Sequence, residues 1–214
     1  RVLFRSYIYD ISSKQLTEVA PSTVDLLLPS GAENLNYVLY TDESPYKMHR
    51  EWLDRLPFDV YSVNVHTGTK QLIGRNYRTT PKWSVNGKWA VMYDPIAQVW
   101  NKFDGATGNV VNISDAIGYP MFVESYDQPA PAPAYGIAGW TADGNNVFLY
   151  DAYDWWKVDL TGERRPECLT KGYGRKHGKA IRKMTSNIDK DVFQKDEKVI
   201  VSLWDKDTMD EGVY

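Results

Sequence analysis

The sequence predicts an all-β fold made of repeated small antiparallel sheets, and two recurring patterns carry this prediction. The run WSVNGKWAVMYD begins at Trp83, and the similar run WTADGNNVFLYD begins at Trp140, 57 residues later (140 − 83). In both runs a Gly turn leads into an apolar stretch that ends in Tyr-Asp, which is typical of a turn feeding a strand. A repeat of about this length indicates the blades of a β-propeller.

The second recurring pattern is a hairpin, two short alternating runs joined by a polar turn. We expect four of them, each forming the outer pair of strands of a blade. They span residues 2–11 with 15–19, 60–65 with 70–73, 99–103 with 109–113, and 155–160 with 164–169.

A strand that ends at or near an aspartate precedes each of the later hairpins and recurs once more near the C-terminus. The aspartates are Asp42, Asp94, Asp151 and Asp205, at spacings of 52, 57 and 54 residues. The sequence therefore predicts a β-propeller fragment of about four to five four-stranded antiparallel blades in one domain, 1–214. The predicted divisions are a blade end (1–29), three blades (30–77, 78–134 and 135–180) and a blade start (181–214).

Stacking should bury both apolar faces of each blade through bulky aromatic side chains. Trp83, Trp140, Tyr93 and Tyr150 are the expected contacts between blades. Asp94 and Asp151 are expected to accept turn hydrogen bonds at the ends of their strands.

Three insertions interrupt the repeat. Residues 43–58 predict a short helix from Tyr46 to Leu56, which Pro57 would end. The proline-rich stretch 114–135 predicts an extended loop, and 171–183 a basic, Gly-rich connection between blades. Insertions of this kind can reach a ligand, so Glu51, Trp52, Glu124 and Tyr126 are the candidate substrate-binding residues; a surface loop without a ligand is the alternative.

Composition excludes several classes of function. The net charge of −3 gives no global electrostatic case for nucleic acid or an anionic membrane, and no apolar run approaches the length of a spanning helix. The single cysteine, Cys168, excludes an internal disulfide. His49, His66 and His177 lie far apart, and Asn86-Gly87 and Asp143-Gly144 read as hairpin turns. We therefore predict no metal, no cofactor and no catalytic residue, because no G-x-S-x-G motif occurs.

Four stretches resemble the β-propeller of prolyl oligopeptidase-family serine peptidases, the dipeptidyl-peptidase and acylaminoacyl-peptidase-like members of Bacteroidetes most of all. They are PFDVYSVNVHTGTKQL (57–72), PKWSVNGKWAVMYD (81–94), GWTADGNNVFLYDAYDWWKVDLTG (139–162) and CLTKGYGRKHGKAIR (168–182). TolB-like propellers share the blade phrases, whereas YDAYDWWKVDLTG followed by LTKGYGRK is more specific. The chain lacks the adjacent Glu-Glu pair by which dipeptidyl peptidases hold a substrate's amino terminus.

The resemblance implies a non-catalytic propeller of an exported serine peptidase, periplasmic or secreted. Its partners would be peptide substrates and its own C-terminal α/β-hydrolase domain, which would carry the Ser-Asp-His triad. Two alternatives stay open: a TolB-like or WD-like binding propeller with no enzyme attached, and a carbohydrate-processing propeller with Asp42, Glu43 and Glu124 as its loose candidates. Because the chain begins and stops in strand-like runs, we expect it to be part of a longer protein. Open blade edges predict self-association.

Overall fold

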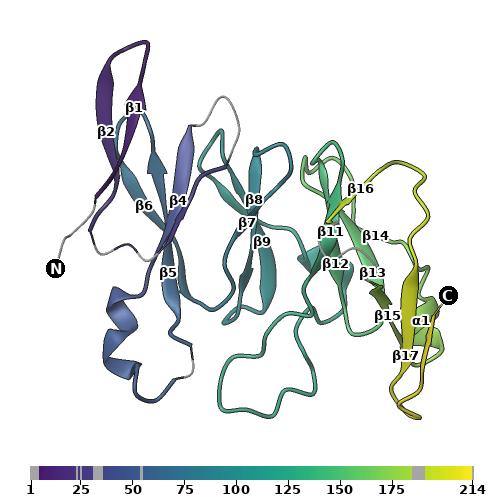
Figure 1. The fold of residues 1–214 in the computed structure, drawn as a ribbon. Coiled ribbons are helices and arrows are strands. Elements are labelled where there is room, and N and C mark those ends of the chain that lie inside the picture. The colour runs from purple at the N-terminus through teal and green to yellow at the C-terminus, as the bar shows by residue number, and fades with distance from the viewer. Residues whose placement is uncertain are drawn as a thin grey trace.

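The computed structural model describes residues 5–22, 24, 26–30, 36–53, 55–184 and 191–213. Within these ranges the chain forms small antiparallel sheets that stand side by side in chain order (Figure 1). The first is a hairpin of β1 (Ser6–Asp10) and β2 (Gln15–Ala20). Residues 2–4 of the first predicted strand lie outside the described part of the chain.

Blades I and II are four-stranded meanders in which each strand pairs with the next one along the chain. The second and third strands pair over six residues in each of these two blades. Blade I comprises β3 (Leu26–Leu28), β4 (Tyr37–Asp42), β5 (Phe58–Asn64) and β6 (Lys70–Tyr77). Blade II comprises β7 (Lys82–Trp83), β8 (Trp89–Asp94), β9 (Val99–Asp104) and β10 (Val110–Asn112).

Blade III is a meander of the same kind with one strand added, and blade IV has three strands. The added strand, β16 (Val192–Phe193), runs parallel to the first strand of blade III. Blade III comprises β11 (Ile137–Thr141), β12 (Asn146–Tyr150), β13 (Trp155–Asp159) and β14 (Glu167–Cys168). Blade IV comprises β15 (Lys179–Lys183), β17 (Val201–Asp205) and β18 (Glu211–Val213).

The strands shift the predicted divisions in two places. β3 belongs to blade I although it precedes residue 30, where that blade was expected to begin. β16 lies in the stretch assigned to the last blade, yet it pairs with blade III. Neither strand shows a clear alternating pattern, because one has three residues and the other two, so their partners are set by tertiary contacts.

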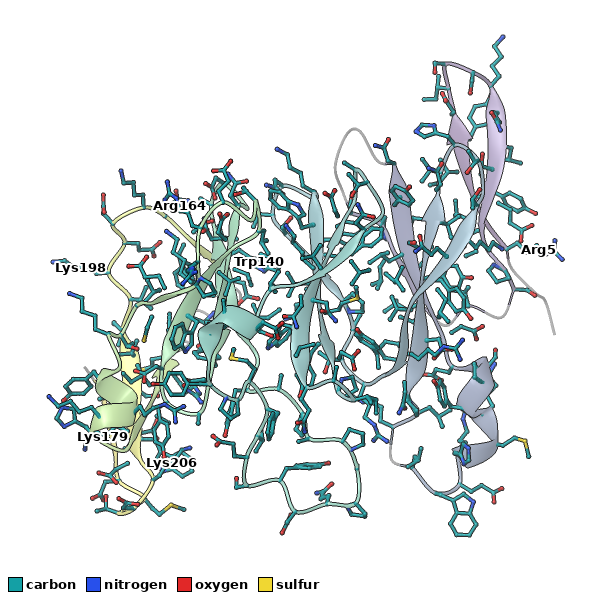
Figure 2. The ribbon with its side chains drawn as sticks, turned by 180° about the vertical axis from the view of Figure 1, so that it is seen from behind. Arg5, Trp140, Arg164, Lys179, Lys198 and Lys206 are labelled. Atoms are coloured by element: carbon teal, nitrogen blue, oxygen red, sulfur yellow. The ribbon has the colours of Figure 1, made fainter. Side chains whose placement is uncertain are left out.

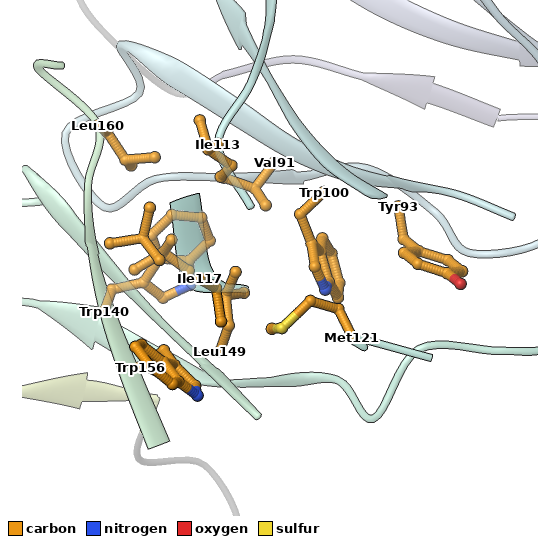
Figure 3. Close-up of a cluster of buried hydrophobic side chains, with 12 residues drawn as sticks. Val91, Tyr93, Trp100, Ile113, Ile117, Met121, Trp140, Leu149, Trp156 and Leu160 are labelled. Carbon is orange, nitrogen blue, oxygen red and sulfur yellow. The ribbon is translucent and has the colours of Figure 1, made fainter. Parts of the chain in front are cut away.

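Apolar side chains from both faces of blades I, II and III meet the neighbouring sheets, as the repeat predicted. In β12, Val147 and Leu149 pack toward blade II, whereas Phe148 and Tyr150 pack toward blade IV. Successive side chains of a strand point to opposite faces, so one buried strand serves two interfaces. Figure 3 shows the cluster between blades II and III, with Trp100 of one blade and Trp140 of the other.

The two Trp-led runs occupy equivalent places. Trp83 and Trp140 both lie in the first strand of a blade and pack toward the preceding blade, while Tyr93 and Tyr150 end the second strand and pack toward the following one. Asp94 accepts hydrogen bonds from the backbone N–H groups of Ile96 (2.9 Å) and Ala97 (3.0 Å), which confirms its predicted turn role. The chain is therefore an all-β, β-propeller-type stack of blades.

The insertions differ from their predicted local structure. The helix expected over 46–56 is a 3₁₀ helix, η1 (Ser44–His49), with no buried residue, so it lacks an apolar face that packing could use to extend it. The loop 114–135 contains a second 3₁₀ turn, η2 (Asp115–Ile117), and buries Ile117 and Met121 between blades II and III. These two segments and α1 (Tyr173–Lys176) lie on one side of the stack, which we call the insertion face (Figure 1).

Candidate functional site

Charged side chains are most deeply buried on the insertion face at the junction of blades III and IV. The turn after β12 places the Asp151 side chain at 0% exposure. One carboxylate oxygen, Oδ1, accepts the backbone N–H groups of Tyr153 (2.7 Å) and Asp154 (2.6 Å), which closes the turn. The other, Oδ2, accepts the indole N–H of Trp156 (3.1 Å) and pairs with Nη2 of Arg175 (3.2 Å). The turn role predicted for Asp151 is confirmed, and the ion pair adds to it.

Asp154, 2% exposed, ties the connection between blades III and IV to the same turn. Its Oδ1 accepts the hydroxyl of Thr170 (2.6 Å) and the N–H of Gly174 (2.9 Å), and its Oδ2 accepts the N–H of Arg175 (3.0 Å). A Cβ at Gly174 would lie 2.7 Å from the carbonyl oxygens of both Tyr153 and Lys179. The close approach of these backbones therefore requires glycine at 174, and it fixes the backbone position of the next residue, Arg175.

Arg182 reaches the turn from β15, the first strand of blade IV. Its Nη2 donates to the carbonyl oxygens of Asp151 (2.8 Å) and Ala152 (3.2 Å), and its Nη1 donates to its neighbour Ile181 (2.7 Å). Burial lowers the pKa of Arg182, and the charges of Tyr150 and Asp151 oppose that shift. The guanidinium therefore serves mainly to cap carbonyl groups that the turn leaves without strand partners.

Tyrosine rings alternate with the cations at this junction. The Arg175 guanidinium carbon lies 4.1 Å from the ring centroid of Tyr119 and 5.0 Å from that of Tyr153. The Lys206 nitrogen lies 4.1 Å from the Tyr153 centroid and 5.9 Å from that of Tyr135. The Arg182 guanidinium carbon lies 5.6 Å from the Tyr135 centroid and 4.7 Å from that of Tyr150. Such cation–π contacts become stronger as water is excluded. This tyrosine–cation row runs Tyr119, Arg175, Tyr153, Lys206, Tyr135, Arg182, Tyr150.

Lys206 differs from the two arginines of the row. Its side chain is half-buried, and no carboxylate lies within ion-pair distance of its ammonium among the residues that the structure describes. Burial lowers the pKa of Lys206, the Arg182 charge lowers it further, and Glu124 acts in the opposite direction. The ammonium is thus partly desolvated and flanked by like charges.

A pocket of about 340 Å³ opens beside Arg175. Trp156 and Tyr119 form part of its apolar wall, with ring centroids 5.9 Å apart, and Lys176 adds a second cation. Its remaining lining residues are Asp154, Cys168 and Gly172. The pocket can take a small group with an apolar part and a negatively charged part.

A larger pocket, of about 650 Å³, lies between blade III and the segment 193–199. Phe148, Trp155 and Phe193 line it together with charged residues of both signs, including Lys195 and Glu197. Its aromatic residues also form the packing cluster between blades III and IV. We therefore assign this space to the blade interface.

The structure separates the two pairs of residues that the sequence nominated. Glu51 and Trp52 follow η1 in the blade I insertion, and the Trp52 side chain is 82% exposed. Glu124 lies at the tyrosine–cation row, because its N–H donates to the hydroxyl oxygen of Tyr135 (3.2 Å). Tyr126 donates its hydroxyl to Gln128 (3.0 Å) within the same loop. Of the predicted candidates, Glu124 alone therefore lies beside the row.

The basic run 171–183 is divided by the fold, whereas the sequence presents it as one cluster. Arg175 and Arg182 turn inward to the aspartate turn, while Lys179 pairs with Asp205 (3.2 Å) and Lys183 with Asp191 (2.9 Å). The sequence analysis named Tyr150 only as a packing residue and missed Lys206 and the other three tyrosines of the row, Tyr119, Tyr135 and Tyr153. Only the repeated Tyr-Asp at the end of β12 hinted at them, because the row joins residues from four separate segments.

Among the described residues, no group of three or more His, Cys, Asp or Glu side chains is placed to hold a metal ion. The helices in that part of the chain are all too short or too polar to cross a membrane.

No protein-family model and no curated protein matches the sequence. The solved structures that match this chain include TolB from Acinetobacter baumannii (TM-score 0.36, 12% identity) and the β-propeller domain of the Trilobed protease from Pyrococcus furiosus (TM-score 0.34, 10% identity). The first alignment covers 96% of this chain and 47% of TolB, and the second covers 98% of this chain and 73% of the protease domain. The chain thus spans about half the length of TolB. The assignment to the β-propeller class rests on the blades themselves.

Proposed function

We propose that this chain is the non-catalytic propeller portion of an exported serine peptidase, which shapes and restricts the access of peptides to a separate α/β-hydrolase domain. The observation that carries the proposal is the gathering of the insertions on one face of the stack (Figure 1). The segments 43–57 and 113–136 on this face are long enough to reach a second domain or a peptide.

Exposed apolar side chains on the blade I insertion support a docking role. Met48 is 92% exposed and Trp52 is 82% exposed, although neither side chain is needed for the packing of a blade. Tryptophan is strongly enriched among the residues that dominate protein interfaces. We infer that Trp52 contacts the hydrolase domain or the peptide that passes between the domains.

A resemblance to prolyl oligopeptidase-family propellers supports the proposal that the second domain is an α/β-hydrolase. The resemblance lies in residues 57–72, 81–94, 139–162 and 168–182. In that family the propeller caps the hydrolase domain that carries the triad. The same resemblance underlies the proposed periplasmic or secreted location.

The first experiment compares this chain with the protein encoded by its complete reading frame. The longer protein should contain G-x-S-x-G followed by Asp and then His, and should cleave fluorogenic peptides by acyl-enzyme chemistry. This chain alone should show no turnover. Peptide hydrolysis by the isolated chain, or a complete reading frame without such a domain, would refute the proposal.

The second experiment tests whether the insertion face controls access. Trp52→Ala in the complete protein should change kcat/KM for peptides and leave the hydrolysis of a small ester unchanged. The matched control is Ile11→Ala in the hairpin, because Ile11 is 83% exposed and lies at the β1–β2 turn. Equal effects of the two variants on peptides would contradict the gating role.

A binding propeller with no attached enzyme, of TolB-like or WD-like type, is the second candidate. The tyrosine–cation row favours it, because the row is complete within this chain and does not depend on a hydrolase domain. A complete reading frame that lacks the triad would select this alternative.

A further inference from the structure

The tyrosine–cation row carries one more positive charge than the buried carboxylates around it neutralise. Arg175, Arg182 and Lys206 contribute three cations, whereas Asp151 and Asp154 contribute two carboxylates that are 0% and 2% exposed. Arg175 is paired with Asp151, and Arg182 donates to three carbonyl groups. Lys206 is therefore the cation of the row that no buried carboxylate pairs, and the exposed Glu124 acts on it without forming an ion pair.

We propose that Lys206 and the adjoining rings of Tyr153 and Tyr135 bind the carboxylate of an acidic peptide. This inference deepens the proposed function, on which it rests only for the peptide nature of the ligand. An ammonium group has three donors, and that of Lys206 has no carboxylate within ion-pair distance among the described residues. A ligand carboxylate would supply an acceptor and an opposite charge at ion-pair distance.

The surroundings of Lys206 explain why an anion would bind there and not merely remain in water. The ammonium lies 4.1 Å from the Tyr153 centroid, and burial together with Arg182 lowers its pKa, so the charged form is under-stabilised in the free protein. A bound carboxylate relieves that cost. Charge-assisted hydrogen bonds in such partly desolvated sites are shorter and stronger than neutral ones.

The buried carboxylates of Asp151 and Asp154 favour a monovalent carboxylate over a phosphate dianion, because they repel each added negative charge in a setting that screens charge poorly. The tyrosine rings at 4.1 Å and 5.9 Å from the Lys206 nitrogen add flat apolar surface, which suits a peptide segment.

Glu124 is the natural competitor of the ligand. Its charge raises the pKa of Lys206, and its backbone N–H donates to Tyr135, so it lies near the site without forming an ion pair in this conformation. If a ligand carboxylate displaces the influence of Glu124, then Glu124→Gln should tighten binding. If Glu124 is instead the only acid that Lys206 attracts, Glu124→Gln should not strengthen peptide binding.

The test is an NMR titration of this chain with capped peptides. Acetyl-Ala-Glu-Ala-amide and acetyl-Ala-Ala-Ala with a free carboxyl end distinguish a side-chain carboxylate from a terminal one, and acetyl-Ala-Gln-Ala-amide is the uncharged control. We expect at least one acidic peptide to bind about tenfold more tightly than the Gln peptide, the scale of one charge-assisted hydrogen bond. Inorganic phosphate should bind more weakly than that peptide.

Variants then locate the binding. Lys206→Met should weaken acidic-peptide binding about tenfold. Lys198→Met, at an exposed position distant from Lys206 in Figure 2, should leave binding unchanged. Glu124→Gln should strengthen it several-fold, and this gain does not depend on how well the Lys206 variant folds.

Equal binding of the Glu and Gln peptides, an unaltered affinity in Lys206→Met, tighter binding of phosphate, or no gain in Glu124→Gln would each overturn the proposal. Because the titration needs no hydrolase activity, its failure leaves the peptidase assignment standing. A failed peptidase assay likewise leaves the carboxylate site standing.

Discussion

Replacing Asp151 by Asn isolates the electrostatic contribution of the buried turn. The Asp151 side chain is 0% exposed and accepts four hydrogen bonds. In the variant, the amide oxygen can still accept the N–H groups of Tyr153 and Asp154. The amide NH₂ then faces the indole N–H of Trp156 and the guanidinium of Arg175, so both donors lose their acceptor.

The magnitude follows from these two losses. An unsatisfied buried donor costs about 1–3 kcal/mol, and breaking a fully buried ion pair costs about 3–5 kcal/mol. The Arg175 side chain is 30% exposed, so water replaces part of the lost pairing. We therefore expect Asp151→Asn to lower the free energy of unfolding by about 3 kcal/mol. For a domain of this size that corresponds to a fall in Tm of about 6–12 °C.

Urea unfolding followed by tryptophan fluorescence and circular dichroism measures this loss. Asp127→Asn is the matched control, because Asp127 is exposed on the insertion face, and its replacement should change the free energy of unfolding by less than about 0.5 kcal/mol. A loss below about 1 kcal/mol in Asp151→Asn would refute the reasoning, since it would mean that water already satisfies the turn.

Four other predictions concern the blades and their tyrosines. Trp155→Phe should destabilise the fold by about 1 kcal/mol more than Trp100→Phe, because the Trp155 indole donates to Ile181 of the next blade (2.9 Å) while the buried Trp100 indole has no acceptor among the described residues; urea midpoints of both variants decide this. Gly174→Ala should cost about 2 kcal/mol, because its Cβ would meet two carbonyl oxygens at 2.7 Å, and unchanged thermal unfolding would contradict that requirement. Burial raises the pKa of Tyr40, Tyr46, Tyr77 and Tyr93 to about 12, so their contribution to stability is complete below pH 10 and is lost as the pH rises from 10 through 12. Absorbance at the phenolate band should show these tyrosines titrating late and together with unfolding, and their titration near pH 10 in the folded protein would be the contrary result. Exposed residues of the hairpin, including Tyr9, predict concentration-dependent self-association that Tyr9→Ser weakens, and a strict monomer in sedimentation at all concentrations would exclude it.

Much of the fold was predictable because it depends on local patterns. The unbroken apolar runs in WAVMYD and NVFLYD make each of these strands apolar on both faces, because successive side chains point to opposite faces, and a stack of sheets buries both faces at once. The Asp after each such strand closes a turn with its own backbone, which is also local. The short strands β3 and β16 escaped prediction, since two or three residues show no period.

The candidate site was only partly predictable. Glu124 was nominated from its place in an insertion, and the structure puts it beside the tyrosine–cation row. Nothing in the sequence could show that Tyr119 lies against Arg175 or that Tyr153 lies against Lys206, because no periodic pattern relates these residues. Their contact depends on the angle at which blade IV packs on blade III.

The sequence by itself determined the blade repeat, the apolar faces and the positions of the insertions, because short apolar runs and turn chemistry act over a few residues. Only the tertiary structure decided that the basic run 171–183 divides, with two arginines turned toward a buried aspartate turn, and that the Lys206 ammonium lies against tyrosine rings without an ion pair among the described residues. The physical reason is that burial and charge pairing are set by neighbours in space, and these neighbours come from four segments of the chain.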